Sequence, residues 1–268
     1  MAERLSIAFF GDCVGAPGRQ ALQQGIAALR AQVPSAAVIV NGENVKNGSG
    51  ITPDLYRALR QLGADAVTLG DHAFRDGKIS TVLEDPSEPI LRPANLSQKA
   101  PGKRWIRIPE GHGRPRAVFV VTVLGRVFFN LPADDPFACV DRVLAELPEP
   151  DPIVVVEAHM EATSEKAALA HYLDGRVTAV IGTHTHVPTA DARVMPRGTA
   201  FITDVGMCGP YASIIGRDPV GVLRAMTTGV HTPFEMGSGD LRACGCLIEM
   251  DVASRGAASI TRLETRAS

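Results

Sequence analysis

Residues 180–188 read Val-Ile-Gly-Thr-His-Thr-His-Val-Pro, and the rest of the chain is organised around this stretch. Its apolar start leads into Gly182, which is typical of a buried strand that ends at a turn. Residues two apart in an extended segment point the same way, so His184 and His186 can converge on one object, such as a metal ion. A histidine beside a strand end is often only a hydrogen-bonded structural residue, so the H-x-H pattern alone leaves both interpretations open.

Side chains of metal-ligand type follow four other apolar runs. They are Gly11-Asp12 after residues 5–10, Asn41-Gly42-Glu43-Asn44 after residues 36–40, Gly70-Asp71-His72 after residues 66–69, and Ala158-His159 at the end of residues 152–159. Open α/β sheets assemble their sites at the carboxyl ends of strands. Each cluster alone could be turn or cap chemistry. Their repetition at successive strand ends favours one shared site.

The apolar runs alternate with helical segments in the first half of the chain. Residues 15–32 predict a helix with Pro17 in its first turn, and Thr52 followed by Pro53 predicts the start of another that ends near Gly63. Further helices are expected at residues 78–84, at 135–147 and after a cap at Thr163 or Ser164.

Short strands are expected in the second half of the chain as well. They are predicted at residues 104–109, 117–123, 126–130 and 199–203, with a hairpin of residues 244–252 and 257–263 around Ser254-Arg255-Gly256. The pattern predicts an α/β fold whose second sheet has mixed strand directions. Without a recognisable linker, residues 1–268 are expected to form a single domain.

Composition narrows the class of protein. Hydrophobic residues make up 45% of the chain and charged residues 21%, which is ordinary for a soluble globular protein, and the net charge of −2 gives no general attraction to nucleic acid or anionic membranes. We expect a cytoplasmic protein, because no segment resembles a signal peptide or a membrane span. Five scattered cysteines without C-x2-C spacing argue against a disulfide framework or a structural zinc.

Some polar residues and segments give weaker indications of their place relative to the site. Asn95 is expected to close a turn rather than to contact the site, and His171 is expected to be a structural residue of a helix. Residues 204–210 predict a tight loop close to the site. Residues 218–240 predict a helix or loop whose glycine-rich end, including His231, lies over the cleft.

The collected side chains indicate a metal centre with two ions. The candidates are Asp12, Glu43, Asn44, Asp71, His159, His184 and His186, with His72 beside a ligand. Carboxylate, amide and imidazole ligands without thiolate suit Mn, Fe or Zn, and this set is too large for one ion. Ion pairs roughly 3.5–4 Å apart activate a bridging water and clamp phosphoryl oxygens, so phosphoester hydrolysis is the expected reaction.

Several longer motifs carry a family resemblance that spans almost the whole chain. They are GDCVGAPGR at residues 11–19, NGEN at 41–44, GDH at 70–72, RPAN at 92–95, HMEATSEK at 159–166, GTHTHVPTAD at 182–191 and TDVGM at 203–207. Through these motifs the chain resembles the YmdB-like branch of the calcineurin-like metallophosphoesterases.

The resemblance implies a fold and a role for each candidate residue. The implied fold is a four-layer α/β sandwich of two mixed sheets flanked by helices. The implied centre holds one ion with Asp12, Asn44 and His186 and a second with Asp71, His159 and His184, while Glu43 bridges them. His72 would be the general acid. Proteins of this family resemble phosphodiesterases of 2′,3′-cyclic nucleotides, with phosphomonoesterase activity on model substrates also associated with the group.

Two positions depart from the pattern that the resemblance implies. Asp71 stands where the family usually has asparagine, which adds a negative charge to the second ion site. Val14 stands where many other metallophosphoesterases carry the histidine of a D-x-H motif, and Asn44 compensates for it in this branch.

The expected function is therefore a metal-dependent phosphodiesterase or phosphatase. The expected cofactors are two divalent or mixed-valence transition-metal ions, Fe or Mn, with Zn as an alternative. The expected partner is a small phosphoester such as a cyclic nucleotide, without stable binding of nucleic acid or membrane, and a homo-oligomer stays open. The competing hypotheses are a regulatory metal-binding scaffold with weak or vestigial phosphatase activity and, among enzymes, a lipid or protein phosphatase.

Overall fold

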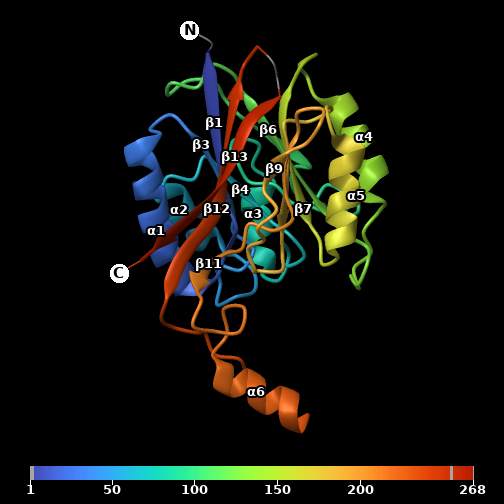
Figure 1. Cartoon of the computed structure of the whole chain (residues 1–268). Coiled ribbons are helices and arrows are strands. Elements are labelled where there is room, and N and C mark those ends of the chain that lie inside the picture. The colour runs from blue at the N-terminus through green and yellow to red at the C-terminus, as the bar shows by residue number, and fades with distance from the viewer. Residues whose placement is uncertain (1–2, 254–255, 268) are drawn as a thin grey trace.

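The computed structural model describes residues 3–253 and 256–267, which form two packed β-sheets with helices on both outer sides (Figure 1). Helices α1 (Gly15–Gln32) and α2 (Pro53–Gln61) cover one sheet, and α4 (Pro136–Glu146) and α5 (Thr163–Leu173) cover the other. The predicted four-layer α/β sandwich is confirmed.

The first sheet is built around three parallel strands. Within the described residues its order is β2-β11-β12-β1-β3-β4, with β13 paired to β12. The parallel pairs β1–β3 and β3–β4 end at the same edge. The bounds are β1 Arg4–Phe10, β2 Asp12–Cys13, β3 Ala37–Asn41, β4 Ala66–Thr68, β11 Met207–Pro210, β12 Leu241–Asp251 and β13 Ala257–Arg266.

The second sheet has a parallel centre and antiparallel edges, as the predicted mixed direction requires. Its order is β5-β6-β7-β8-β10-β9; β6, β7, β8 and β10 are parallel, whereas β5 and β9 run against their neighbours. The bounds are β5 Trp105–Ile108, β6 Val118–Leu124, β7 Ile153–His159, β8 Ala179–Thr183, β9 Arg193–Val194 and β10 Ala200–Ile202.

Alternate side chains of the two sheets form the central core. Ile7 and Phe9 of β1 face Val155 of β7 and Ile181 of β8 within one buried cluster. The intervening residues of each strand pack against the helices, so every residue of β7 is buried. Burying one such aliphatic side chain contributes about 1.5–3 kcal/mol, which is why the strands read as continuous apolar runs.

The remaining helices are short or peripheral. A 3-10 helix, η1 (Gly77–Ile79), precedes α3 (Ser80–Leu83), while α6 (Pro219–Thr228) projects from the lower end of the body in Figure 1. No helix of the described residues has both the length and the apolar character that a membrane span requires.

Several predicted boundaries need correction. Residues 126–130 form a turn rather than a strand. Residues 207–210 form strand β11 instead of a loop, since Met207 and Cys208 continue the first sheet beside β2. Neither Thr163 nor Ser164 caps α5, because Ala162 occupies the cap position and makes no side-chain hydrogen bond. The predicted hairpin is present as β12 and β13, but its tip at residues 254–255 lies outside the described residues.

Candidate metal centre

The predicted ligands all lie at the carboxyl edge of the two sheets. Asp12 follows β1, the 41–44 cluster follows β3, Asp71 follows β4, His159 ends β7, and the 184–186 segment follows β8. The packing of the two sheets on a shared core brings these ends together. Gly70 makes this possible, because a Cβ there would lie 2.2 Å from His159 Nε2.

One group of side chains surrounds a common point near His159. Ligand atoms of Glu43, Asp71, His159 and His184 all lie within 4.8 Å of one another. His159 Nε2 is 2.9 Å from Asp71 Oδ1, 3.2 Å from Glu43 Oε1 and 3.2 Å from His184 Nδ1. Together these are the residues predicted for the second ion and its bridge.

A second group lies on the other side of Glu43. The Nδ2 of Asn44 lies 3.1 Å from His186 Nε2, 3.4 Å from Asp12 Oδ1 and 3.4 Å from Glu43 Oε1. A half-turn of the amide exchanges its nitrogen and oxygen, and Oδ1 would then face the other ligand atoms. Val14 is buried and offers no ligand atom. The side chain that lies between Asp12, Glu43 and His186 is that of Asn44.

Hydrogen bonds fix which ring nitrogen each histidine presents to the centre. His186 Nδ1 lies 3.0 Å from the carbonyl oxygen of Ile215, and His184 Nε2 lies 3.1 Å from Glu161 Oε2. Because these oxygens only accept, the opposite ring nitrogen in each case turns a lone pair toward the centre. Metal-ligating histidines are oriented in this way.

His159 is oriented through a buried relay. Its Nδ1 lies 2.9 Å from Thr183 Oγ1, which donates to Glu157 Oε1 at 2.8 Å. Glu157 also accepts from Asn41 Nδ2 at 2.7 Å, and Asn41 Oδ1 accepts from the backbone N of Glu43 at 3.0 Å. The relay therefore links the His159 ring to the backbone of Glu43.

The H-x-H segment differs from the extended geometry expected of it. His184 has φ of 92° and His186 φ of 65°, both in the left-handed region that costs energy for residues with a side chain. Both rings still reach the centre, but they join different groups of ligands. The segment turns at Thr185 instead of continuing the strand.

A buried ion pair holds this turn in place. Asp204 Oδ2 accepts from Thr185 N at 3.1 Å and from Thr185 Oγ1 at 2.8 Å. The same oxygen lies 2.8 Å from Lys166 Nζ, and both side chains of the ion pair are almost fully buried. Asp204 and Lys166 thus fix the strained backbone between the two histidines.

The electrostatics of the centre fit a cation. Without one, burial raises the pKa of Asp12 to about 7, and the nearby charge of Glu43 adds to this. Burial opposes protonation of His159, yet the carboxylates of Glu43 and Asp71 raise the pKa of its ring well above the usual value. Burial alone would raise the pKa of Asp71, but hydrogen bonds with His159 and His184 lower it. Converging carboxylates and ring lone pairs of this kind suit transition-metal ions.

His72 lies beside the two groups without joining them. Its Nδ1 is 2.8 Å from Asn44 Oδ1 and its Nε2 is 3.4 Å from Asp71 Oδ2, while its backbone N donates to Glu43 Oε2 at 3.0 Å. A quarter of the side chain is exposed. The ring can therefore meet a group bound at the centre.

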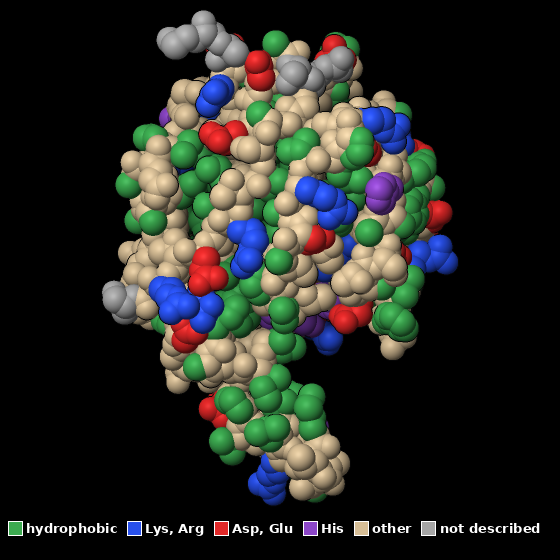
Figure 2. All heavy atoms as spheres, in the orientation of Figure 1, with side chains coloured by type: hydrophobic (Ala, Val, Ile, Leu, Met, Phe, Trp, Pro, Cys, Tyr) green, Lys and Arg blue, Asp and Glu red, His purple; other side chains and the backbone are tan. Residues whose placement is uncertain are grey.

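Two cavities open onto the centre. The first, which we name the aromatic cavity, has a volume of about 670 Å³; Asp71, Phe74, Leu96, Phe128, Phe129 and His184 are among its lining residues. The second, which we name the α6 hollow, has a volume of about 510 Å³; Glu43, His72, His184, Arg217, Met226 and Phe234 are among its lining residues. In Figure 2, histidine side chains are visible in the recess between the body and α6.

The weaker signals have mixed outcomes. Asn95 lies in a turn as predicted, but its side chain does not close that turn, because it hydrogen-bonds the backbone of the distant residues Leu124 and Asp134. Helix α6 does line a hollow beside the centre, but His231 is exposed and is not among the lining residues. His171 is an exposed residue of α5.

The supporting residues Lys166, Asp204, Glu157 and Glu161 were missed as parts of the site. Glu157 did carry a signal, because a carboxylate within the apolar run of residues 152–158 needs buried partners. Lys166 and Asp204 have no local sequence signal of this kind, because they pair across 38 residues of sequence.

Comparisons with known proteins agree with this geometry. A family model described as YmdB-like protein matches residues 8–263. A Bacillus subtilis (strain 168) protein named 2′,3′-cyclic-nucleotide 2′-phosphodiesterase is 40% identical over 259 residues, which are 97% of this chain and 96% of that protein.

Two solved structures share the fold. A hypothetical protein from Thermus thermophilus superimposes with a TM-score of 0.90 at 40% identity, over 98% of this chain and 100% of that one. A phosphatase from Mycoplasma pneumoniae superimposes with a TM-score of 0.90 at 30% identity, over 99% of this chain and 95% of that one.

Proposed function

The chain belongs to the YmdB-like protein family, and from this premise we propose that it hydrolyses 2′,3′-cyclic nucleotides at a centre of two metal ions. Phosphoester hydrolysis is the activity for which its relatives are named. The observation that carries the finer proposal is the convergence of seven ligand-type side chains from five strand ends on two adjacent points.

Each ion has its own set of residues in this proposal. Asp12, Asn44 and His186 would hold one ion, and Asp71, His159 and His184 the other, with Glu43 between them. Bound Fe or Mn ions would supply Lewis-acid stabilisation of the phosphoryl oxygens and an activated water as nucleophile. The chain contributes the orientation of these ligands through Ile215, Glu161 and the Thr183–Glu157 relay.

His72 supplies the proton that the leaving group needs. Water adds to phosphorus as one P–O ester bond of the cyclic phosphate breaks, and the released ribose oxygen takes a proton from the His72 ring. The product is a nucleoside monophosphate. His72 is suited to this step because its ring is partly exposed and lies in the α6 hollow beside Glu43.

The test of the proposed function is turnover of 2′,3′-cyclic AMP by wild type and by His72→Ala after loading with Mn or Fe. Loss of the general acid should lower kcat by about 10²- to 10⁴-fold while the metal content stays unchanged. Turnover of a bis(nitrophenyl) phosphodiester by His72→Ala should fall much less, because nitrophenolate leaves without a proton.

His171→Ala is the matched control, since it removes an exposed histidine of α5. It should keep full activity. Unchanged cyclic-nucleotide turnover in His72→Ala would refute the acid assignment. Absence of turnover of any diester by the metal-loaded wild type would favour the regulatory scaffold.

Asp71→Asn tests the effect of the additional carboxylate. Asp71 Oδ1 lies 2.9 Å from His159 Nε2 and 3.3 Å from His184 Nδ1, so its charge falls within the group of ligands predicted for the second ion. We expect the asparagine variant to bind Fe at least about tenfold more weakly relative to Mn, and to change its rate with anionic diesters. Metal analysis beside steady-state kinetics provides the check. Identical metal ratios and identical rates in both proteins would reject the prediction.

A further inference from the structure

We propose that the aromatic cavity binds the nucleobase of the substrate, with the ring of Phe74 as its stacking surface. The proposal rests on the proposed function, because it assigns a subsite to the same cyclic nucleotide. It identifies a side chain that selects nucleotides over other cyclic phosphates.

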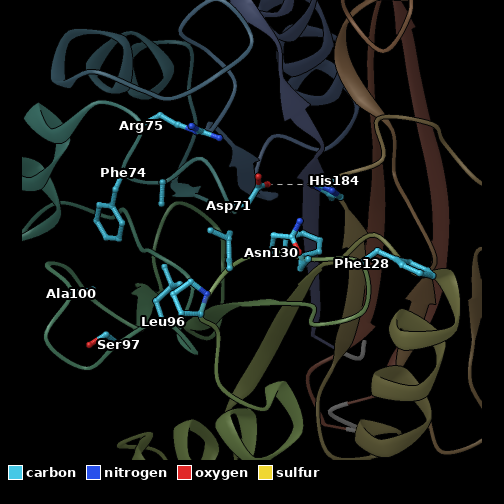
Figure 3. Close-up of a pocket in the computed structure, with 13 residues that line it drawn as sticks. Asp71, Phe74, Arg75, Leu96, Ser97, Ala100, Phe128, Asn130 and His184 are labelled. Atoms are coloured by element: carbon cyan, nitrogen blue, oxygen red, sulfur yellow. Dashed lines mark ion pairs between the residues drawn. The ribbon is translucent and has the colours of Figure 1, made fainter. Parts of the chain in front are cut away.

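The cavity is placed next to the reacting centre. Asp71 and His184, both predicted ligands of the second ion, belong to its lining. Figure 3 shows the ion pair of these two residues between the two sides of the cavity, with Phe74, Leu96 and Ala100 on one side and Phe128 on the other. A phosphoryl group at the centre would therefore direct its organic part into this space.

The size of the cavity suits a nucleoside. Its volume of about 670 Å³ falls within the range of small-molecule sites, roughly 300–1,000 Å³. The ring of Phe129 packs on His184, with 4.8 Å between the ring centroids, and lines the cavity beside this predicted ligand. The ring of Phe128 is 84% exposed and stands at the outer rim.

The chemistry of the lining suits a flat, uncharged group. Phe74, Leu96 and Pro132 give the walls an apolar character, whereas Arg75 is the one Lys or Arg side chain among the described residues that line it. A second phosphate would find little positive charge there. A base can stack on an aromatic ring regardless of its identity, and the Asn130 amide can donate or accept as the base requires. Broad tolerance of different bases follows.

The α6 hollow is the other space beside the centre, and it has a different role. Glu43, Asn44, His72 and His186 line it, so it contains the reacting groups themselves. Arg217 also lines this hollow. Its guanidinium donates to the carbonyl oxygens of Asn47, Gly48 and Phe234 and so links the backbone of residues 47–48 to that of residue 234. This hollow admits the cyclic phosphate, and the base extends past Asp71 into the aromatic cavity.

The experiment compares two cyclic phosphates that differ in the nucleoside. Wild type should show a KM for 2′,3′-cyclic AMP at least about tenfold below that for glycerol 1,2-cyclic phosphate, which has no base. Phe74→Leu keeps an apolar side chain but removes the flat ring, and should raise the KM for cyclic AMP about fivefold to tenfold. Phe74→Tyr restores the ring and should restore the KM. None of these changes should affect the glycerol substrate.

Two further variants test whether the effect is specific to the aromatic cavity. Ser97→Trp, at an exposed position of the lining, should obstruct the aromatic cavity. In calorimetry it should weaken the binding of 3′-AMP but not the binding of inorganic phosphate. Phe137→Leu makes the same kind of change on helix α4, at a residue that lines neither cavity, and should leave both substrates unaffected.

The proposal is overturned if Phe74→Leu retains the wild-type KM for cyclic AMP and Ser97→Trp retains the wild-type affinity for 3′-AMP, or if Phe137→Leu shows the loss instead. Equal KM values of wild type for both substrates would also overturn it while leaving the proposed function intact. Failure of wild type to hydrolyse either substrate would refute the proposed function itself.

Discussion

Glu43→Gln is expected to lower the turnover of 2′,3′-cyclic AMP by more than about 10³-fold, because both the activated water and the Lewis-acid stabilisation depend on the bridge. Glu43 Oε1 lies 3.2 Å from His159 Nε2 and 3.4 Å from Asn44 Nδ2, so this oxygen belongs to both groups of ligands. The glutamine keeps an acceptor for the backbone N of His72 but lacks the negative charge. Turnover and metal stoichiometry are measured together.

The same substitution should change the stability of the metal-free protein only slightly. Burial and the charge of Glu43 raise the pKa of Asp12, and against the effect of burial the same charge raises the pKa of the His159 ring. Removing this charge relieves a repulsion with Asp12 and loses an attraction to His159, so the urea midpoint should stay close to that of wild type. Glu88→Gln is the control, since Glu88 is a partly buried carboxylate that accepts from Tyr56 away from the centre. Wild-type turnover in Glu43→Gln would contradict the bridging role.

Asp204→Ala is expected to destabilise the protein by about 3–5 kcal/mol, because it leaves the buried ammonium group of Lys166 without its counter-charge. It also frees Thr185, whose backbone N and hydroxyl both donate to Asp204. The strained segment between the two histidines should then relax, and metal affinity should fall about 10- to 100-fold. Urea unfolding and calorimetric Mn titration measure the two effects.

A double variant separates charge from geometry. Asp204→Asn with Lys166→Met removes both charges and keeps an acceptor for Thr185, so it should recover most of the lost stability. If Asp204→Ala unfolded within about 0.5 kcal/mol of wild type, the range of ordinary surface substitutions, the ion pair would have no such role.

The local pattern of the sequence was sufficient to locate the strand ends of the candidate site. Buried parallel strands need apolar residues on both faces, so a polar group after such a run marks the edge of a sheet. Asp12, Glu43 and His159 were found in this way. Their assignment to two separate ions came from the family resemblance, because strand order and crossing cannot be read from spacing.

The backbone conformation of the H-x-H segment could not be predicted from the local sequence pattern. Alternation predicted an extended segment, but His184 and His186 have positive φ and the chain turns between them. That conformation depends on Asp204 and Lys166, which come from other parts of the fold. Long-range hydrogen bonds therefore override the local preference of the backbone.

The turn at residues 126–130 is another tertiary effect. The backbone N of Gly125 donates to His159 O, and Glu165 accepts from the backbone N of Arg126 and Val127. These bonds turn the chain out of the sheet after β6. The aromatic residues that the sequence assigned to a strand line a cavity instead.

Anomalous scattering from crystals of the Mn-loaded protein tests the central claim most directly. Two peaks are expected roughly 3.5–4 Å apart, one beside Asp12, Asn44 and His186, the other beside Asp71, His159 and His184, with Glu43 between them. A fully active protein with a single peak, or with its metal bound away from these residues, would contradict it.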